Sequence, residues 1–193
     1  MILQRKMTDK EFSLMQLIMR FVDHVHPYIQ ERVELFGVKP GQTVVDYGCG
    51  PGRYTVEFAR LVGANGKVIA VDLVEAALLE TSKKLEAGGF ENFELALAHK
   101  YDSGVEANTA DTVFAIDMFH HIADTDAFLQ EVYRIAKPNG TLILSGGHML
   151  RSSIKSKIAA SGLWEISKEH KEFIVYRRKT DTNKTDSQLS CMT

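Results

Sequence analysis

The sequence predicts an α/β domain with a doubly wound, mostly parallel sheet and helices on both of its faces. Strand-like and helix-like segments alternate along most of the chain, which is typical of such sheets. The strand-like segments include continuous apolar runs such as VIAV and TLIL, as expected where helices cover both faces of parallel strands. A glycine-rich loop also joins the first strand-like segment to a helix, at the edge where these sheets bind ligands.

The first part of the chain has a helical rather than a strand-like pattern. Residues 8–11 read T-D-K-E, a capping box that begins a helix expected to end near Val25. Pro27 interrupts this pattern, and a second, short helix is expected up to Phe36. We expect residues 1–36 to form a helical lid over the substrate.

Residues 37–179 are expected to form the main domain, in which the elements alternate. The expected strands are, in chain order, Thr43–Tyr47, Lys67–Asp72, Phe93–Ala98, Asp111–Asp117 and Thr141–Ser145. The expected helices between them are Arg53–Leu61, Val74–Ala87 and Asp124–Ala136.

The C-terminal part departs from this alternation. A helix over Ser152–Ala160 is followed by two strands, Leu163–Ser167 and Glu172–Arg178, with no helix between them. Two strands joined in this way form an antiparallel hairpin, which we place at the edge of the sheet. Residues 180–193 are polar and poor in apolar side chains, and we expect this tail to be disordered.

The composition is that of an ordinary globular domain. The 193 residues are 45% hydrophobic and 25% charged, which suits one domain with one core. A net charge of -2 gives no electrostatic reason to expect a nucleic-acid or membrane partner. Two cysteines, Cys49 and Cys191, are too few for a disulfide framework or a cysteine-rich zinc site. With no leader-like or membrane-spanning apolar segment, we expect a cytoplasmic protein.

The most informative segment is the glycine-rich loop after the first strand. Residues 44–53 read V-V-D-Y-G-C-G-P-G-R, with Gly48, Gly50 and Gly52 between a buried strand and a helix. Glycine lets the backbone turn sharply and approach a ligand closely. The spacing is G-x-G-x-G, whereas the dinucleotide fingerprint is G-x-G-x-x-G and needs a small residue where Arg53 stands.

An acidic residue, Asp72, ends the second strand. A carboxylate at this position can accept hydrogen bonds from both ribose hydroxyls of an adenosine ligand. The alternative is that the glycines form only a tight turn and that Asp72 is a solvated strand end. The agreement between strand, glycines and distal acid favours a nucleoside ligand.

These residues resemble those of the class I S-adenosylmethionine-dependent methyltransferases, in particular the small branch related to ubiquinone/menaquinone C-methyltransferases. The resemblance covers residues 39–179. Its motifs are D-Y-G-C-G-P-G at 46–52, a fourth strand that runs into D-M-F-H-H-I at 117–122, and a helix that ends in K-P-N-G at 137–140. The family has a Rossmann-like, seven-stranded sheet whose last strand is antiparallel, in agreement with the hairpin inferred above.

The resemblance implies S-adenosylmethionine as the cofactor. Asp46 would orient the loop, which holds the methionine part, while Asp72 would bind the ribose and Leu73 would flank the adenine. Where the family usually has Gly-Asp after the third strand, this chain has Ala98-His99, so that His99, or Asp102 nearby, would take the adenine contact. The expected cofactor residues are Asp46, Tyr47, Gly48, Cys49, Gly50, Gly52, Asp72, Leu73, His99 and Asp117.

Three histidines near strand ends are the candidates for a general base. Methyl transfer depends mainly on alignment, and a base is needed only where the acceptor loses a proton. His120, His121 and His148 are suited to that role because imidazole titrates near neutral pH. A structural role is the alternative for each. Because His120 and His121 are adjacent, we expect their side chains to point in different directions.

Absent motifs narrow the function. There is no N/D-P-P-Y/F after the fourth strand and no Pro-Cys nucleophile, which argues against adenine N-methylation and cytosine C5 methylation. No ligand spacing suggests a metal. The sequence therefore predicts a methyltransferase that acts on a small molecule. The alternatives are a protein or RNA acceptor, a cofactor-binding subunit without turnover, and a nicotinamide or flavin oxidoreductase.

Overall fold

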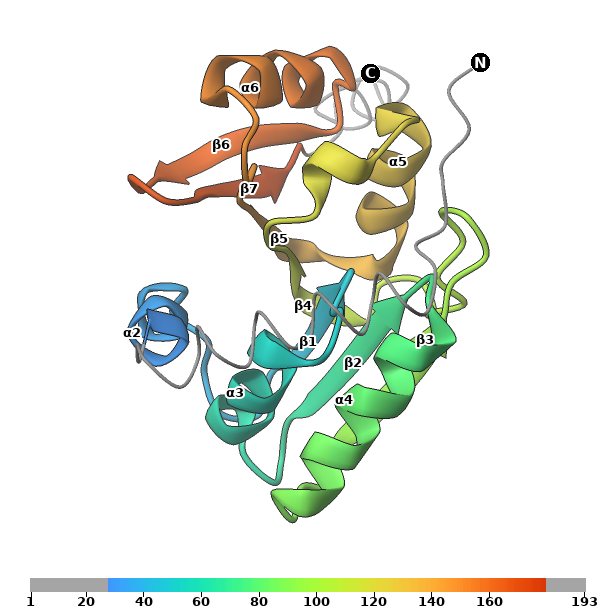
Figure 1. The fold of residues 1–193 in the computed structure, drawn as a ribbon. Coiled ribbons are helices and arrows are strands. Elements are labelled where there is room, and N and C mark those ends of the chain that lie inside the picture. The colour runs from blue at the N-terminus through green and yellow to red at the C-terminus, as the bar shows by residue number, and fades with distance from the viewer. Residues whose placement is uncertain (1–27, 180–193) are drawn as a thin grey trace, which may run out of the picture.

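The computed structural model describes residues 28–179 (Figure 1). The expected helix that begins at residue 8 and the expected disorder of residues 180–193 lie outside this range. The strands are β1 (Thr43–Tyr47), β2 (Lys67–Asp72), β3 (Phe93–Leu97), β4 (Ala110–Ala115), β5 (Ala136–Leu144), β6 (Trp164–Glu169) and β7 (Ile174–Arg178). The helices are α2 (Tyr28–Leu35), α3 (Arg53–Val62), α4 (Glu75–Ala87), α5 (Thr125–Ile135) and α6 (Arg151–Ala160), with a 3-10 helix, η1, at Phe119–His121.

The seven strands form one sheet in the order β3-β2-β1-β4-β5-β7-β6. The first five strands pair in parallel. β7 is antiparallel to both β5 and β6, so the predicted hairpin and the antiparallel last strand are confirmed. The chain winds from β1 outward through β2 and β3, then returns to β4 on the other side of β1. The switch point of the sheet therefore lies between β1 and β4, and loops that leave their carboxyl ends are neighbours.

Helices cover both faces of the sheet, as predicted (Figure 1). Successive residues of a strand face opposite sides: Val44 packs among residues of α2 and α3, whereas Val45 packs among residues of α5 and α6. Both side chains are fully buried. This two-sided burial explains why the inner strands are continuous apolar runs rather than alternating patterns.

Two parts of the fold differ from the sequence-based expectation. β5 begins at Ala136 rather than Thr141, because the K-P-N-G segment that was expected only to end α5 already lies beside β4. The register shifts there, between Ala110 and Thr112, as expected where a proline cannot donate to the ladder. α2 belongs to the core of the main domain, since Ile29 and Val33 pack in the cluster under α3. A lid role for residues 1–36 remains a prediction.

Candidate active site at the carboxyl edge of the sheet

The glycine loop lies between β1 and α3, and each of its three glycines has a positive φ: +78° at Gly48, +53° at Gly50 and +74° at Gly52. A Cβ at Gly48 would lie 3.0 Å from Met118, and one at Gly52 would lie 2.7 Å from Thr81 Oγ1. A Cβ at Gly50 would meet no atom within 4 Å. Two glycines thus permit close packing, while Gly50 borders open space in which a ligand can approach the backbone.

Asp72 joins the loop to the end of β2. Its Oδ2 accepts a hydrogen bond from the Gly50 amide at 2.8 Å, and its Oδ1 accepts one from the Val74 amide at 2.9 Å. Burial raises the pKa of Asp72, although these amide bonds act in the opposite direction. A carboxylate has about four lone-pair sites, so that Asp72 can brace the loop and still accept hydrogen bonds from a ligand.

Asp46 is 3% exposed on β1. Its Oδ2 accepts a hydrogen bond from Thr55 Oγ1 at 2.6 Å, which ties the strand to the first turn of α3. Burial raises the pKa of Asp46 to about 7. This position suits the predicted role of orienting the loop rather than contact with the cofactor.

The side chains of Tyr47 and Cys49 point away from the open side of the loop. Tyr47 packs edge-on against Phe128 and donates its hydroxyl to the Tyr101 carbonyl at 2.8 Å. Cys49 is buried in a small cluster that includes Leu78, and burial raises the pKa of its thiol. These two predicted cofactor residues could therefore contribute only their backbones.

The predicted adenine side lies at the ends of β2 and β3. Leu73 packs against the main core cluster. His99 is exposed and pairs through its backbone with Asp102, with N–O distances of 2.8 and 3.1 Å. The two side chains that the sequence offered for the adenine contact thus lie on neighbouring backbone at this edge.

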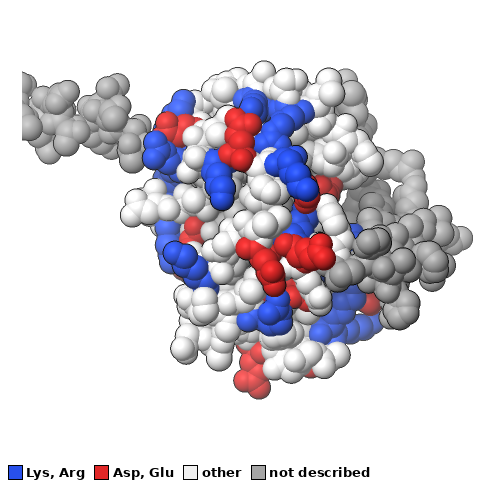
Figure 2. Space-filling view, turned by 90° about the vertical axis from the view of Figure 1, so that its left-hand side faces the viewer, with Lys and Arg blue, Asp and Glu red and all other residues white. Residues whose placement is uncertain are grey.

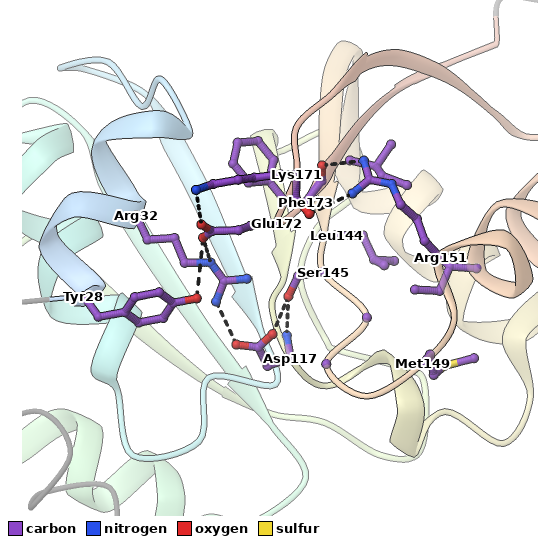
Figure 3. A pocket seen from close by; sticks show the side chains of 14 residues that line it. Tyr28, Arg32, Asp117, Leu144, Ser145, Met149, Arg151, Lys171, Glu172 and Phe173 are labelled. Atoms are coloured by element: carbon purple, nitrogen blue, oxygen red, sulfur yellow. Dashed lines mark hydrogen bonds and ion pairs between the residues drawn. The ribbon is translucent and has the colours of Figure 1, made fainter. Parts of the chain in front are cut away.

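Asp117 follows β4 and is held in a strained conformation, with φ +56°. Ser145 Oγ donates to its Oδ1 at 2.6 Å, and Arg32 Nη1 donates to its Oδ2 at 2.8 Å (Figure 3). Burial alone would raise the pKa of Asp117, but the hydrogen bonds from Arg32 and Ser145 outweigh it, and its pKa lies below the ordinary value. Asp117 is therefore an ionised carboxylate beside the glycine loop.

The three predicted histidines form one cluster. The ring centroids of His120 and His121 are 3.9 Å apart, and those of His120 and His148 are 5.9 Å apart. The expectation that His120 and His121 point in different directions is wrong: although their Cα–Cβ bonds diverge on η1, rotation about the side-chain bonds brings the rings together. Burial, followed by repulsion from the other two imidazoles, lowers the pKa of His120.

The residues that hold Asp117 were not predicted from the sequence. Arg32, on α2, is 4% exposed and also donates to the Tyr54 hydroxyl at the start of α3. It forms a longer ion pair with Glu172, in the turn between β6 and β7. An arginine on a short helix carries no motif, and only the fold shows that these segments meet; Ser145, at the end of the fifth predicted strand, could have been proposed from its position.

The 28–179 segment contains no group of three or more His, Cys, Asp or Glu side chains arranged to hold a metal ion. Nor does any helix within it combine the length and apolar character needed to cross a membrane.

Comparisons with known proteins agree with this geometry. The sequence model of a methyltransferase-domain family matches residues 38–183. The ubiquinone/menaquinone biosynthesis C-methyltransferases UbiE of Escherichia coli O1:K1 / APEC and Shigella boydii serotype 18 are each 34% identical over 113 residues, which is 58% of this chain and 45% of theirs. The chain thus spans less than half the length of these curated relatives.

Solved structures show the same fold. A SAM-dependent methyltransferase from Aquifex aeolicus is 25% identical, with a TM-score of 0.70, over 77% of this chain and 88% of the other. A TehB-like SAM-dependent methyltransferase from Corynebacterium glutamicum is 14% identical, with a TM-score of 0.71, over 89% of this chain and all of the other. The second likeness concerns the fold alone.

Proposed function

This chain belongs to a family of methyltransferase domains, the class I enzymes that depend on S-adenosylmethionine, and we propose that it methylates a small-molecule acceptor. One observation carries the proposal. At the switch point of the sheet, Gly50 borders open space while its amide is fixed by the Asp72 carboxylate, and the histidine cluster lies at the end of the neighbouring strand.

The residues at this edge fit the cofactor. Any residue but glycine at position 50 would put a Cβ into the open space, and Asp72 keeps acceptor capacity beyond its two backbone bonds. We assign the ribose hydroxyls to Asp72 and the methionine part to the backbone of residues 48–50. Leu73 and His99 would border the adenine.

S-adenosylmethionine supplies an electrophilic methyl group on its sulfonium sulfur. Because the transfer is an in-line displacement, the main task of the protein is alignment. Where the acceptor must lose a proton, we assign that proton to His120, whose lowered pKa keeps it neutral at pH 7. His120 lies against Gly147, where a Cβ would come within 3.0 Å of Nδ1, and Gly147 lines a cavity next to the ends of β4 and β5.

A small acceptor is supported by the relatives and by the surface. The UbiE relatives are named for ubiquinone and menaquinone biosynthesis, which suggests carbon methylation of a small ring compound. On the face drawn in Figure 2, Lys and Arg alternate with Asp and Glu among the described residues. A basic stripe would instead favour RNA.

Calorimetry and methyl tracing test the proposal. We expect saturable binding of adenosylhomocysteine and none of NAD or NADP. With S-adenosylmethionine carrying a labelled methyl group and a whole-cell extract that contains small molecules, protein and RNA, label should enter the low-molecular-mass fraction. Label in the protein or RNA fraction would refute the small acceptor, and binding of NAD in place of adenosylhomocysteine would refute methyl transfer.

A further inference from the structure

A second compartment adjoins the proposed cofactor site. A cavity of about 310 Å³ lies between α2, the ends of β4 and β5, the start of α6 and the turn between β6 and β7 (Figure 3). Its lining includes Asp117 but neither the loop glycines nor Asp72. Asp117 precedes Met118, whose side chain lies against Gly48 of the loop, so a molecule in the cavity would lie close to the proposed cofactor site.

The cavity has an apolar side and a polar side. Leu144, Ile154, Phe173 and Ile174 line the apolar side, and each is at most 3% exposed. The polar side carries hydrogen-bond donors from α2 and from the turn. Because the apolar side chains are nearly covered, such a lining suits a small ligand whose polar group meets the donors and whose apolar part is compact.

Three donors on the polar side converge on the carboxylate of Glu172. Tyr28 Oη and Arg32 Nε each lie 3.5 Å from Oε2, and Lys171 Nζ lies 3.6 Å from Oε1 (Figure 3). Hydrogen bonds to a carboxylate are normally about 2.7–2.9 Å long from a charged nitrogen donor and about 2.5–2.7 Å long from a hydroxyl. Arg32 Nε, although buried, makes no hydrogen bond with any residue in the described part of the chain. The donors thus surround a carboxylate that none of them binds tightly.

The turn that carries Glu172 is held by bonds that do not involve the Glu172 carboxylate. Its turn is closed by a hydrogen bond from the His170 amide to the Phe173 carbonyl at 2.9 Å. Arg151 holds the same turn through the carbonyls of Lys171 and Phe173. Asp117, in contrast, is fixed by short bonds at 2.6 and 2.8 Å. Of the two carboxylates, only that of Glu172 is loosely held.

We propose that Arg32, Tyr28 and Lys171 form a subsite for the carboxylate of a ligand, which Glu172 fills until the ligand displaces it. The cavity also contains the carboxylates of Asp117 and Glu172, but Asp117 is already paired with Arg32. A carboxylate that replaces Glu172 keeps the charge balance of the site and gains the unused Arg32 Nε. The inference rests on the proposed methyl transfer, because the carboxylate belongs either to the methyl acceptor, its body on the apolar side of the cavity, or to the methionine part of the cofactor.

Titrations with small probes test the subsite. Benzoate, benzyl alcohol and benzylamine share an apolar ring and differ in charge, and each is titrated with and without saturating adenosylhomocysteine. Of the three probes, we expect only benzoate to bind. Glu172→Gln, which removes the competing charge, should tighten benzoate binding, and Lys171→Gln, which removes an exposed positive charge, should weaken it by about two- to fivefold. Lys168→Gln, an exposed change on β6 outside the cavity lining, should alter nothing.

Arg32→Gln should abolish benzoate binding. Because this buried change could unfold the protein, Lys171→Gln, at an exposed position, is the second and independent variant. Two further measurements show which molecule carries the carboxylate. If benzoate and adenosylhomocysteine bind at the same time, the carboxylate is that of the methyl acceptor. Methylthioadenosine lacks the carboxylate of adenosylhomocysteine. If benzoate competes with adenosylhomocysteine, and if Glu172→Gln raises the affinity for adenosylhomocysteine but not for methylthioadenosine, the carboxylate is that of the cofactor.

Two results would overturn the subsite. One is preferential binding of benzylamine that Glu172→Gln weakens. The other is a set of benzoate, adenosylhomocysteine and methylthioadenosine affinities that neither Glu172→Gln nor Lys171→Gln changes. Failure of the wild-type chain to bind adenosylhomocysteine would instead refute the proposed methyl transfer. The benzoate titration in the absence of adenosylhomocysteine would still test the subsite.

Discussion

The loop glycines have similar backbone conformations but different surroundings, and this contrast gives a matched pair of variants. Alanine at either Gly50 or Gly52 incurs left-handed strain of about 1–2 kcal/mol. At Gly52 the new Cβ also meets Thr81 at 2.7 Å, whereas at Gly50 it enters open space. We expect Gly52→Ala to lower the melting temperature more than Gly50→Ala. Only Gly50→Ala should remain well folded while losing affinity for adenosylhomocysteine in calorimetry; unchanged affinity would mean that the loop does not approach the ligand.

Asp72 combines a structural and a binding role, which two substitutions can separate. Asp72→Asn keeps an acceptor oxygen for one of the two backbone bonds but loses the charge, while Asp72→Ala loses the charge and both acceptors. Hydrogen bonds to a charged group are worth about 1.5–3 kcal/mol each, so both variants should bind adenosylhomocysteine at least tenfold more weakly. Asp72→Ala should also be less stable. Asp126→Asn, at an exposed position on α5, is the control, and wild-type affinity in both Asp72 variants would exclude the ribose assignment.

The buried carboxyl of Asp46 predicts a pH-dependent stability. Its folded pKa, raised by burial to about 7, lies above the unfolded value of about 3.9. The folded state therefore binds the proton more tightly, and the contribution of this group to stability is lost as pH rises through 7. Relative to Asp46→Asn, the wild type should gain stability from pH 8 to pH 5 in urea unfolding. A constant difference between the two proteins over this range would contradict the prediction.

Among the elements, α5 holds the loop that follows β3. Glu131, 9% exposed, accepts hydrogen bonds from the amide and hydroxyl of Ser103 and pairs with Arg134 at 2.8 Å. Removing this carboxylate leaves the buried Ser103 groups unsatisfied, so Glu131→Ala should lower the free energy of unfolding by about 2–3 kcal/mol. The matched control is Glu165→Ala in the exposed pair with Arg177, which should cost less than about 1 kcal/mol. Equal losses would show that burial does not matter here.

The elements that could be predicted from the sequence are those whose residue pattern fits only one kind of structure. β1 and β2 begin and end where the sequence indicated, because they are apolar runs bounded by turn residues. The start of β5 was missed because Pro138 and Gly140 normally end structure, whereas here the neighbouring β4 tolerates an irregular register. The position of α2 could not be predicted, since a short amphipathic helix does not specify the face on which it packs.

For the whole molecule, the sheet topology decides which predicted residues meet. The loop at 48–52, Asp72 and Asp117 could be placed at one edge from the sequence, because parallel strands present their carboxyl ends together. Arg32 and Glu172 could not, because they approach only through the packing of α2 and the hairpin against this edge. Their contact brings the two ends of the described chain together at the site, and no local sequence pattern predicts it.

The histidine cluster likewise exists only in the whole fold, since His148 follows β5 while His120 and His121 follow β4, and its chemistry can be tested through pH. If His120 accepts a proton from the acceptor, His120→Asn should lower kcat by about 10²–10⁴-fold without weakening adenosylhomocysteine binding. Because a base must be neutral, wild-type turnover should fall only as pH drops through the lowered pKa of His120.

The neighbouring histidines provide the control for this assignment. Repulsion from His121 and His148 helps to lower the pKa of His120, so His121→Gln or His148→Gln should let it rise. The acidic limb of the pH–rate profile should then move to higher pH, while kcat at high pH stays near the wild-type value. Loss of turnover in His148→Gln with none in His120→Asn would identify His148 as the base. Equal turnover in all three variants would leave alignment as the only contribution of the protein.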